Sequence, residues 1–434
     1  MKGKLAVEKE NLAINGGKKS VPDGLKIKWP IVTRQDKEAI LKTLDEQILH
    51  GPYVPEVMAL EKDFAKYIGT KYCIATNSGT AALHMNIAAA GIGPGDEVIT
   101  TAFTFLSSAT AVLHHNAIPV FVDINPRTFN INPQKIEEKI TSETKAIIPV
   151  HIHGLPADMD EISQIAKKHN LIVIEDACQA PGATYHGKKV GNFGDMAAFS
   201  LNATKNLPGI EGGLLVTNNK KYRDEANMLR MFGEEIKPGE KREYNAYGMG
   251  WMYRTYGMPA AFARRQLKRL DKYNANAQKN AEFLSKHLAE IKGIVPPFVP
   301  EDRTSVYHKY RVRLDPPELN IDIELSKFKD KVMKTLKAEG VDVVLWQSLP
   351  VPGQTLFQLK EGYGRGCPWS CPYYKKEIKY DIQEYPETVK LLNESFAVCS
   401  EPYPIYAQKL ELMKYYVEAF HKVFNNLEQV LETV

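Results

Sequence analysis

The sequence predicts an α/β protein whose large domain holds a mostly parallel sheet of seven strands, followed by a smaller α+β C-terminal domain. Between about residues 70 and 220, short runs rich in valine and isoleucine alternate with stretches at helical spacing. Several of these runs are apolar throughout, which is typical of strands covered on both faces. The alternation of strands with helices favours one parallel sheet with helices on both sides.

Seven apolar runs are the candidate strands, and three periodic stretches between them are the candidate helices. The strands are expected at Tyr72–Ala75, Glu97–Thr100, Pro119–Asp123, Ala146–His151, Leu171–Glu175, Ala197–Leu201 and Leu214–Thr217. The helices are expected at Thr80–Ala90, Ser107–His114 and Met159–His169. Open α/β sheets bind ligands beyond the carboxyl ends of their strands, so the residues that follow each strand are the most informative.

The second half of the chain has different patterns. An amphipathic stretch, Pro259–Ile291, predicts a helical bridge, and His308–Leu314 alternates like an antiparallel strand. Helices are expected at Ile323–Glu339 and Lys409–Glu432, and residues 350–380, which lack periodicity, are expected to form a long loop. We therefore expect an N-terminal arm over residues 1–35, a large domain over 36–290 and a small domain over 291–434.

The composition argues against several functional classes. With 56 basic and 52 acidic residues in 434, the net charge of +4 is too balanced for a nucleic-acid or membrane-surface protein. No stretch approaches the roughly 18 apolar residues of a transmembrane helix, and the N-terminus lacks the apolar core of a signal peptide. Five cysteines, an odd number, suit a reducing compartment. We expect a cytoplasmic protein without nucleic-acid or membrane partners.

Two segments after predicted strands have the character of a binding site. The turn Asn77–Thr80 stands between a strand and a helix, where small residues and free N–H groups let an anion approach. A simple helix cap is the alternative interpretation of this turn. Phe105 follows the strand Glu97–Thr100 and is placed to stack on a planar cofactor, although core packing would also explain it.

Two further segments carry reactive groups. Asp176 follows the apolar run 171–174 and suits a partner for a protonated ring nitrogen, with a helix cap or a magnesium ligand as alternatives. Lys205 follows the strand Ala197–Leu201 and precedes the glycine-rich run Gly209–Gly213. Such a setting suits an amine that loses its proton to form an imine, whereas most lysines simply lie on the surface. Together the four segments supply the parts of a site for pyridoxal 5′-phosphate (PLP).

The sequence resembles the DegT/DnrJ/StrS sugar aminotransferases, a family of PLP-dependent transferases with the aspartate-aminotransferase fold (fold type I). The stretches that carry the resemblance are NSGTAALHMNIAAAGIGPGDEVITTAFTF (77–105), IPVFVDINPRTFNI (118–131), TKAIIPVHIHGLPADMD (144–160), IEDACQAPGATYHGKKVGNFGDMAAFSLNATKNL (174–207) and EGGLLVTN (211–218). The resemblance implies PLP as the cofactor and a homodimer. It also implies transfer of an amino group from glutamate or glutamine to a keto-sugar or keto-cyclitol.

The resemblance also assigns roles to individual residues. Lys205 matches the lysine that forms the Schiff base, Asp176 the acid paired with the pyridine nitrogen, and Gln179 a residue near the ring hydroxyl. The remaining cofactor contacts are the phosphate ligands Gly79, Thr80 and Ser200 and the stacking residue Phe105. For the substrate, the family often places a histidine where this chain has His308, and residues 50–56, 230–256 and 350–375, including Tyr53, are expected to shape the pocket.

One position departs from the family. Its members usually carry an asparagine that reaches the phosphate of the partner subunit's cofactor, and Met252 stands at that position within Gly250–Arg254. A thioether cannot donate a hydrogen bond. Either the contact is missing, or a neighbour such as Asn245 or Tyr253 supplies it.

Two other functions are consistent with the same residues. Relatives that dehydrate sugars carry histidine in place of Lys205, so the lysine favours amino transfer. However, LAINGG (12–17) and GCPWSCPYY (366–374) resemble a subset acting on cyclitols or aromatic-amine precursors. A PLP-dependent dehydratase or lyase acting on a cyclitol-like or aminoshikimate-type substrate is therefore one alternative. A non-catalytic PLP or sugar-nucleotide sensor is the other.

Two further groups could in principle take part in binding. Cys367 and Cys371 lack partners at zinc-like spacing, so no metal site is expected. His151 and His153 lie at a strand end and suit either a cofactor contact or a structural hydrogen bond.

Overall fold

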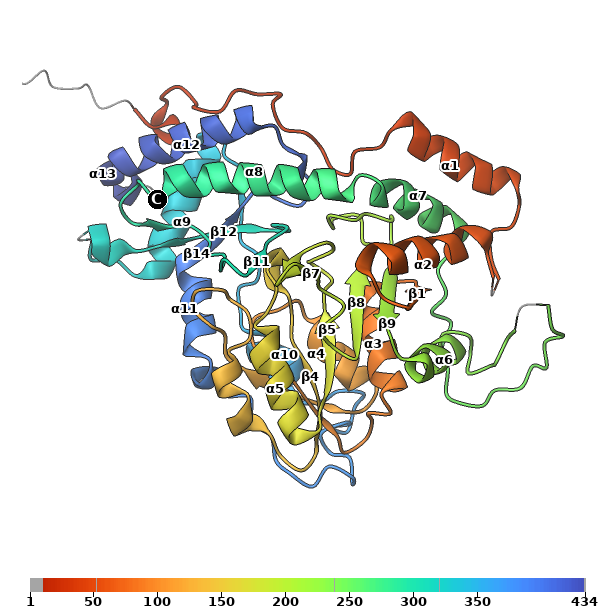
Figure 1. The fold of residues 1–434 in the computed structure, drawn as a ribbon. Helices are drawn as coiled ribbons and strands as arrows, with labels where there is room; N and C mark the ends of the chain where they lie inside the picture. The colour runs from red at the N-terminus through yellow and green to blue at the C-terminus, as the bar shows by residue number, and fades with distance from the viewer. Residues whose placement is uncertain (1–10, 52, 238, 320, 433–434) are drawn as a thin grey trace, which may run out of the picture.

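The computed structural model describes residues 11–51, 53–237, 239–319 and 321–432 and is built around two larger sheets (Figure 1). A third, small antiparallel sheet is formed by β6 (Thr184–Tyr185), β7 (Lys188–Lys189) and β11 (Arg303–Thr304). The largest sheet has seven strands in the order β1-β9-β8-β5-β4-β2-β3. β9 is antiparallel to both its neighbours, and the other pairings are parallel. The strands are β1 Tyr72–Thr76, β2 Glu97–Thr101, β3 Ile118–Val122, β4 Thr144–Ile148, β5 Ile172–Asp176, β8 Met196–Ser200 and β9 Gly213–Thr217. The mostly parallel seven-stranded sheet is confirmed.

Helices cover both faces of this sheet because its strands are apolar on both sides. Val173 and Ile174, adjacent on β5, belong to different cores on opposite faces. On the side of Val173 lie α2 (Pro55–Ile68), α5 (Met159–His169) and α7 (Gly257–Leu267). On the side of Ile174 lie α3 (Gly79–Ala89), α4 (Ser107–His114) and α6 (Lys220–Leu229). Both α4 and α5 have the predicted bounds.

The second sheet is antiparallel and has the order β10-β12-β14-β13. Its strands are β10 Ile294–Val295, β12 Tyr310–Leu314, β13 Val343–Val344 and β14 Ser395–Val398. The helices around it are α8 (Leu270–Leu288), α9 (Leu325–Ala338), α11 (Pro386–Glu394), α12 (Leu410–Asn425) and α13 (Leu427–Glu432). Three residues of the N-terminal arm, Leu12, Val21 and Trp29, are buried in the same core. The domain boundaries at 35 and 290 stay predictions.

The expected helical bridge consists of two helices, α7 and α8, that are separated at Lys268 and Arg269. The guanidinium of Arg269 lies 2.8 Å from the buried carboxylate of Asp36, a residue in the first turn of α1 (Arg34–Asp45). It also donates to the hydroxyl of Thr33 at 3.1 Å. These contacts hold Arg269 near the start of the chain, and α7 then packs against α1 and α2 while α8 turns toward α12 (Figure 1).

The segment 350–380 is more ordered than a long loop. It contains α10 (Thr355–Leu359), and its aromatic side chains share a core with the edge strand β3. The hydroxyl of Tyr380 donates to the carbonyl of Pro119 on β3 at 2.9 Å and accepts from the indole of Trp369 at 2.9 Å. The segment thereby shields an otherwise open sheet edge. In the part of the chain described here, no helix combines the length and apolarity needed to cross a membrane.

Candidate active site

A cavity of about 380 Å³ lies at the carboxyl ends of β1, β5 and β8, which is within the size range of small-molecule sites. Strands of a parallel sheet end at one edge, so the turns that follow them meet there. The sequence-predicted residues that line the cavity are Gly79, Thr80, Phe105, Asp176, Gln179, Ser200, Lys205 and His308.

Lys205 stands on the turn that follows β8. Its backbone N–H donates to the carbonyl of Asn202 at 2.9 Å, and the N–H of Asn202 donates to the hydroxyl of Ser200 at 3.2 Å. Tyr406, from the C-terminal part of the chain, donates to the carbonyl of Thr204 at 2.7 Å. Burial lowers the pKa of the Lys205 amine, although nearby acids such as Asp176 oppose the shift. A lowered pKa increases the fraction of neutral, nucleophilic amine.

Asp176 is the last residue of β5, and its carboxylate is fixed by two donors. The hydroxyl of Ser108 donates to Oδ2 at 2.6 Å, and the backbone N–H of Cys178 donates to Oδ1 at 3.2 Å. The side chain is buried yet lines the cavity. The contacts with Ser108 and Cys178 thus fix the carboxylate of Asp176 at the cavity wall before any ligand binds.

The turn Asn77–Thr80 leads directly into α3. A Cβ added at Gly79 would lie 2.9 Å from Cβ of Ser200 and 3.1 Å from Sγ of Cys178, so only glycine fits there. The first N–H groups of a helix lack intrahelical acceptors, which makes those of Gly79 and Thr80 available to an anion. Phe105 lines the same cavity and is 55% exposed, far more than a core residue of its kind.

Gln179 and His308 complete the predicted set. The side-chain oxygen of Gln179 accepts from the backbone N–H of His153 at 2.8 Å, and Nε2 of His153 accepts from Nε of Arg311 at 3.1 Å. Burial lowers the pKa of His308 well below its ordinary value, which keeps the ring neutral. Nδ1 of His308 is buried and has no hydrogen-bond partner among the described residues. The residue lines the cavity, and its unpartnered Nδ1 is itself closed to solvent.

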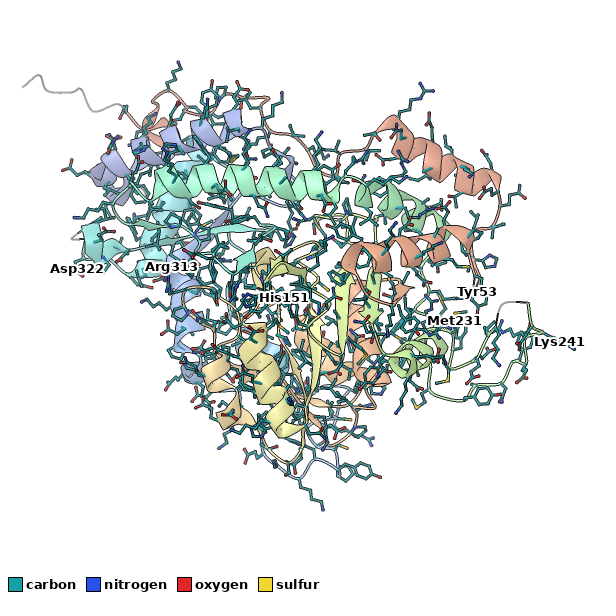
Figure 2. All side chains as sticks on the ribbon, viewed as in Figure 1. Tyr53, His151, Met231, Lys241, Arg313 and Asp322 are labelled. Atoms are coloured by element: carbon teal, nitrogen blue, oxygen red, sulfur yellow. The ribbon has the colours of Figure 1, made fainter. Side chains whose placement is uncertain are left out.

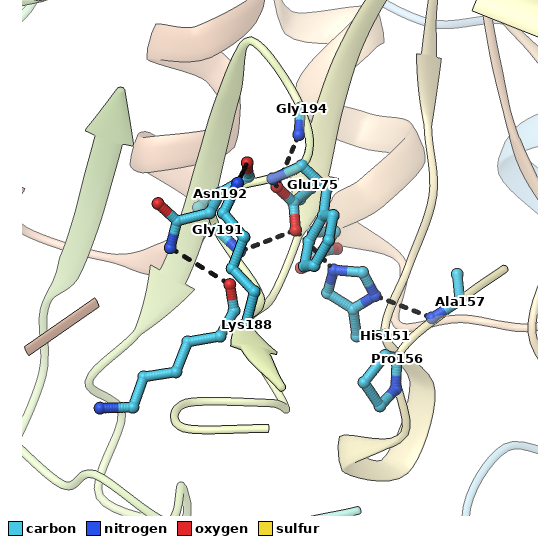
Figure 3. Close-up of polar contacts among 12 residues, drawn as sticks. His151, Pro156, Ala157, Glu175, Lys188, Gly191, Asn192 and Gly194 are labelled. Atoms are coloured by element: carbon cyan, nitrogen blue, oxygen red, sulfur yellow. Dashed lines mark hydrogen bonds and ion pairs between the residues drawn. The ribbon is translucent and has the colours of Figure 1, made fainter. Parts of the chain in front are cut away.

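His151 has a structural role (Figure 3). Its Nε2 lies 2.9 Å from Oε2 of Glu175, and its Nδ1 accepts the backbone N–H of Ala157 at 3.0 Å. The carboxylate of Glu175 also accepts backbone N–H groups of Gly191 and Gly194, each at 2.7 Å. Burial opposes ionisation, but His151 and these N–H groups hold the pKa of Glu175 below its ordinary value.

Tyr53 does not line the cavity of this chain. Its hydroxyl donates to the carbonyl of Ile236, and Figure 2 shows it beside the loop that runs from Met231 past Lys241. At the position that departs from the family, the side chain of Met252 is 37% exposed. The hydroxyl of Tyr253, one of the two suggested substitutes, lies 3.0 Å from His84 of its own chain.

Several lining residues were not predicted from the sequence. Ser107 is one, and its hydroxyl lies 2.7 Å from that of Thr80. Trp346 and Glu401 reach the cavity from the C-terminal part of the chain. Neither has a local sequence signal, because both come from turns that follow β13 and β14 of the second sheet and are far in sequence from the other lining residues. Within the described ranges, no group of three or more His, Cys, Asp or Glu residues is arranged to hold a metal ion.

The fold and this arrangement of residues define a class. A lysine and an acid at the carboxyl edge of a mostly parallel seven-stranded sheet, beside a helix N-terminus, belong to a transferase of the aspartate-aminotransferase fold, fold type I. Comparison with known proteins gives the family. The model of the DegT/DnrJ/EryC1/StrS aminotransferase family matches residues 30–390, and the chain belongs to that family. It is an aminotransferase.

Similar proteins of known name support this assignment. A pleiotropic regulatory protein of Geobacillus stearothermophilus is 38% identical over 340 residues, covering 76% of this chain and 86% of its own. The GDP-perosamine synthase of Caulobacter vibrioides is 39% identical over 316 residues, covering 72% and 81%. Among solved structures, DesV of S. venezuelae in complex with a ketimine intermediate has a TM-score of 0.76 and 28% identity. That match covers 92% of this chain and 99% of DesV.

Proposed function

We propose that this protein is a PLP-dependent aminotransferase that moves an amino group from glutamate or glutamine to a keto-sugar or keto-cyclitol. One observation carries the proposal: Lys205 and Asp176 line the same cavity as the Asn77–Thr80 turn and Phe105. A surface lysine, a capping aspartate and a core phenylalanine would have no reason to converge on one cavity.

The residues present fit PLP. Gly79, Thr80 and Ser200 would hold the phosphate, and the tight packing around Gly79 supports a close approach of backbone to ligand. Phe105 would cover a face of the pyridine ring, which accounts for its exposure in the free chain. Asp176 would pair with the ring nitrogen, and Gln179 would lie near the ring hydroxyl.

When bound, PLP supplies an electron sink for charge that develops on the donor's α-carbon. Lys205 would hold the cofactor, and its free Nζ would take the proton from the donor's α-carbon and later return it. The lowered pKa of that amine favours the form that accepts a proton. The Asp176 carboxylate, fixed by Ser108, would keep a proton on the ring nitrogen.

The acceptor is proposed from the relatives. GDP-perosamine synthase is named for an amino-sugar nucleotide, which supports a keto-sugar as the first acceptor to test. Because the segments 12–17 and 366–374 resemble a subset that acts on cyclitols, keto-cyclitols should be tested as acceptors beside keto-sugars. The position of His308 on the cavity wall supports its role as a polar contact for one of the two substrates.

We propose a cytoplasmic homodimer in which the partner subunit completes the site. Large apolar side chains lie exposed along the loop after α6, among them Tyr247, which is 58% exposed, and Met249, which is 85% exposed. Ile210, five residues after Lys205 and within the glycine-rich run Gly209–Gly213, is 48% exposed. A second copy of the chain would cover such side chains. The five free cysteines suit a reducing compartment.

The test is the Lys205→Ala variant beside Lys221→Ala, which removes an exposed lysine on α6. Lys205→Ala should lose the visible absorbance of lysine-bound PLP and all turnover, because no other amine takes its place. Lys221→Ala should keep both. Turnover of Lys205→Ala near the wild-type rate would sink the proposal.

The same assay separates the alternative functions. The wild-type protein, given glutamate or glutamine, should lose its visible band and regain it when a keto-sugar or keto-cyclitol is added. Water loss from the acceptor without amine formation would instead identify a dehydratase. Binding of PLP without either reaction across the panel would identify a sensor.

A further inference from the structure

His84 lies one turn beyond Thr80 on α3, on the same face of the helix. Its side chain is almost fully buried, at 1% exposure, and both ring nitrogens have partners. Nδ1 is 3.0 Å from the hydroxyl of Tyr253, and Nε2 is 3.2 Å from Nδ1 of His115. The ring also packs against Trp251, with centroids 4.4 Å apart. Both nitrogens of this buried histidine are therefore occupied by contacts within the protein, one helical turn after the start of α3.

Tyr253 lies at the end of the loop that follows α6, and it connects this loop to the Asn77–Thr80 turn. The backbone N–H of Tyr253 donates to the carbonyl of Arg230 at 3.2 Å, which closes the base of the loop. Its own carbonyl accepts the N–H of Asn77 at 2.8 Å, and its ring is stacked on that of Trp251. Tyr253 therefore contacts the first residue of the Asn77–Thr80 turn through its backbone and α3 through its hydroxyl.

The turn between these two attachments has little freedom. Ser78 caps α3 by accepting the N–H of Ala81 at 3.0 Å, and the space at Gly79 is closed by Ser200 and Cys178. A small shift of α3 against the loop would therefore move the N–H groups of Gly79 and Thr80. The bond between His84 and Tyr253 opposes such a shift, together with the packing of His84 on Trp251.

We propose that His84 and Tyr253 are positioning residues that hold the Asn77–Thr80 turn in the geometry needed for a phosphate group. The inference rests on the proposed function, which gives that turn the phosphate of PLP. Neither residue lines the cavity, so both act through the turn. Burial, together with His115 and His114, lowers the pKa of His84 to about 3, so the ring stays neutral and the pair is maintained at physiological pH.

The main test uses Tyr253→Phe, which removes one hydroxyl and leaves the ring stack. The matched control is Tyr363→Phe, since the hydroxyl of Tyr363 donates nearby, to the carbonyl of Leu113 at 3.3 Å, but does not contact His84. The full-length apoprotein would be titrated with PLP, with pyridoxal, which lacks the phosphate, and with inorganic phosphate. Tyr253→Phe should weaken PLP and inorganic phosphate by about fivefold, the effect of one neutral hydrogen bond. Pyridoxal binding should not change, and Tyr363→Phe should match the wild type.

A second pair of variants tests His84. His84→Asn keeps a polar atom close to the position of Nδ1 and should retain phosphate affinity, whereas His84→Leu should lose it about as Tyr253→Phe does. The loss in Tyr253→Phe should not add to that in His84→Leu in the double variant, because both changes break the bond between His84 and Tyr253, although His84→Leu also removes the contact with His115.

Two results would overturn the proposal: wild-type phosphate affinity in Tyr253→Phe, or an equal loss for PLP and pyridoxal, which indicates general damage. Failure of the wild type to bind PLP would instead count against the proposed function, and the inorganic phosphate titration would still decide this inference.

Discussion

Two neighbouring carboxylates at the end of β5 face opposite sides of the sheet and differ in what surrounds them. Both carboxylate oxygens of Glu175 are paired within the protein, with His151 and with the backbone N–H groups of the 191–194 turn (Figure 3). Asp176 is held by the hydroxyl of Ser108 and one backbone N–H, and it lines the cavity. A buried acid whose partners all come from the protein is part of the scaffold. One that is held in place yet open to a cavity is available for chemistry.

The largest effect that this contrast predicts is on catalysis. Asp176→Asn should lower kcat by about 100- to 1000-fold, since an amide stabilises charge on a bound ring far less than a carboxylate does. The fold should be unchanged, because the amide oxygen can still accept the N–H of Cys178 while the new NH₂ donates to the hydroxyl oxygen of Ser108, which can act as donor or acceptor. Single-turnover rates with glutamate, together with the unfolding midpoint, test both statements. If Asp176→Asn lowered the unfolding midpoint as well as the rate, Asp176 would be a structural acid like Glu175, and the contrast between them would fail.

Glu175→Gln should give the reverse result. Replacing one acceptor oxygen by NH₂ sets a donor against backbone N–H donors, and breaking a buried pair of this kind costs about 3 kcal/mol of folding free energy. Urea unfolding measures that loss. The protein that remains folded should turn over near the wild-type rate, and a catalytic defect as large as that of Asp176→Asn would refute the comparison.

Buried histidines around the site predict a smaller, pH-dependent effect on stability. The pKa of His84 is lowered to about 3, and burial lowers those of His153 and His308 well below the ordinary value. Below pH of about 6.5 the unfolded chain binds protons that these folded histidines do not, so the free energy of unfolding falls as the pH falls. From about pH 8 to 5 the loss due to His84 is about 2 kcal/mol. Urea titrations at pH 8, 6.5 and 5 should show a plateau above 6.5 and a decline below it, with a shallower decline in His84→Asn.

The smallest effect is expected at Phe105. Phe105→Leu keeps an apolar side chain but loses the ring face, so PLP affinity should fall by about fivefold, or about 1 kcal/mol. Folding should be unaffected, because the side chain is 55% exposed in the free chain. Equilibrium titration with PLP measures the change. An unfolding midpoint well below that of the wild type would show that Phe105 belongs to the core.

The sequence predicts the large sheet well because each of its strands is a short, continuous apolar run bounded by polar residues. Most of the predicted strand ends are within one residue of the observed ones. The largest difference is at β4, which ends at Ile148 because Pro149 has no N–H to continue the ladder. The residues that follow these strands meet in one cavity for the same reason, since parallel strands end at a common edge.

What the sequence does not predict depends on contacts between distant segments. Ser108 holds Asp176 across a separation of 68 residues, and nothing near either residue signals the pair. Arg269 lies between the two helices of the bridge, where it pairs with Asp36, which is 233 residues away. Trp346 and Glu401 reach the cavity from the turns that follow β13 and β14, more than 130 residues after Lys205. Local periodicity contains no information about these pairings.

The arm at the start of the chain is completed by residues near its end. Leu12, Val21 and Trp29 are buried with α12 and α13, and the backbone N–H of Leu12 donates to the side chain of Gln429 at 3.3 Å. During synthesis these apolar residues are made long before α12 and α13, so they stay exposed until those helices have emerged. The large sheet, by contrast, is formed from one continuous stretch and has all its strands once residue 217 has emerged. A growing chain would therefore bury the arm only after the large sheet has all its strands, which makes docking of the arm a late step in folding.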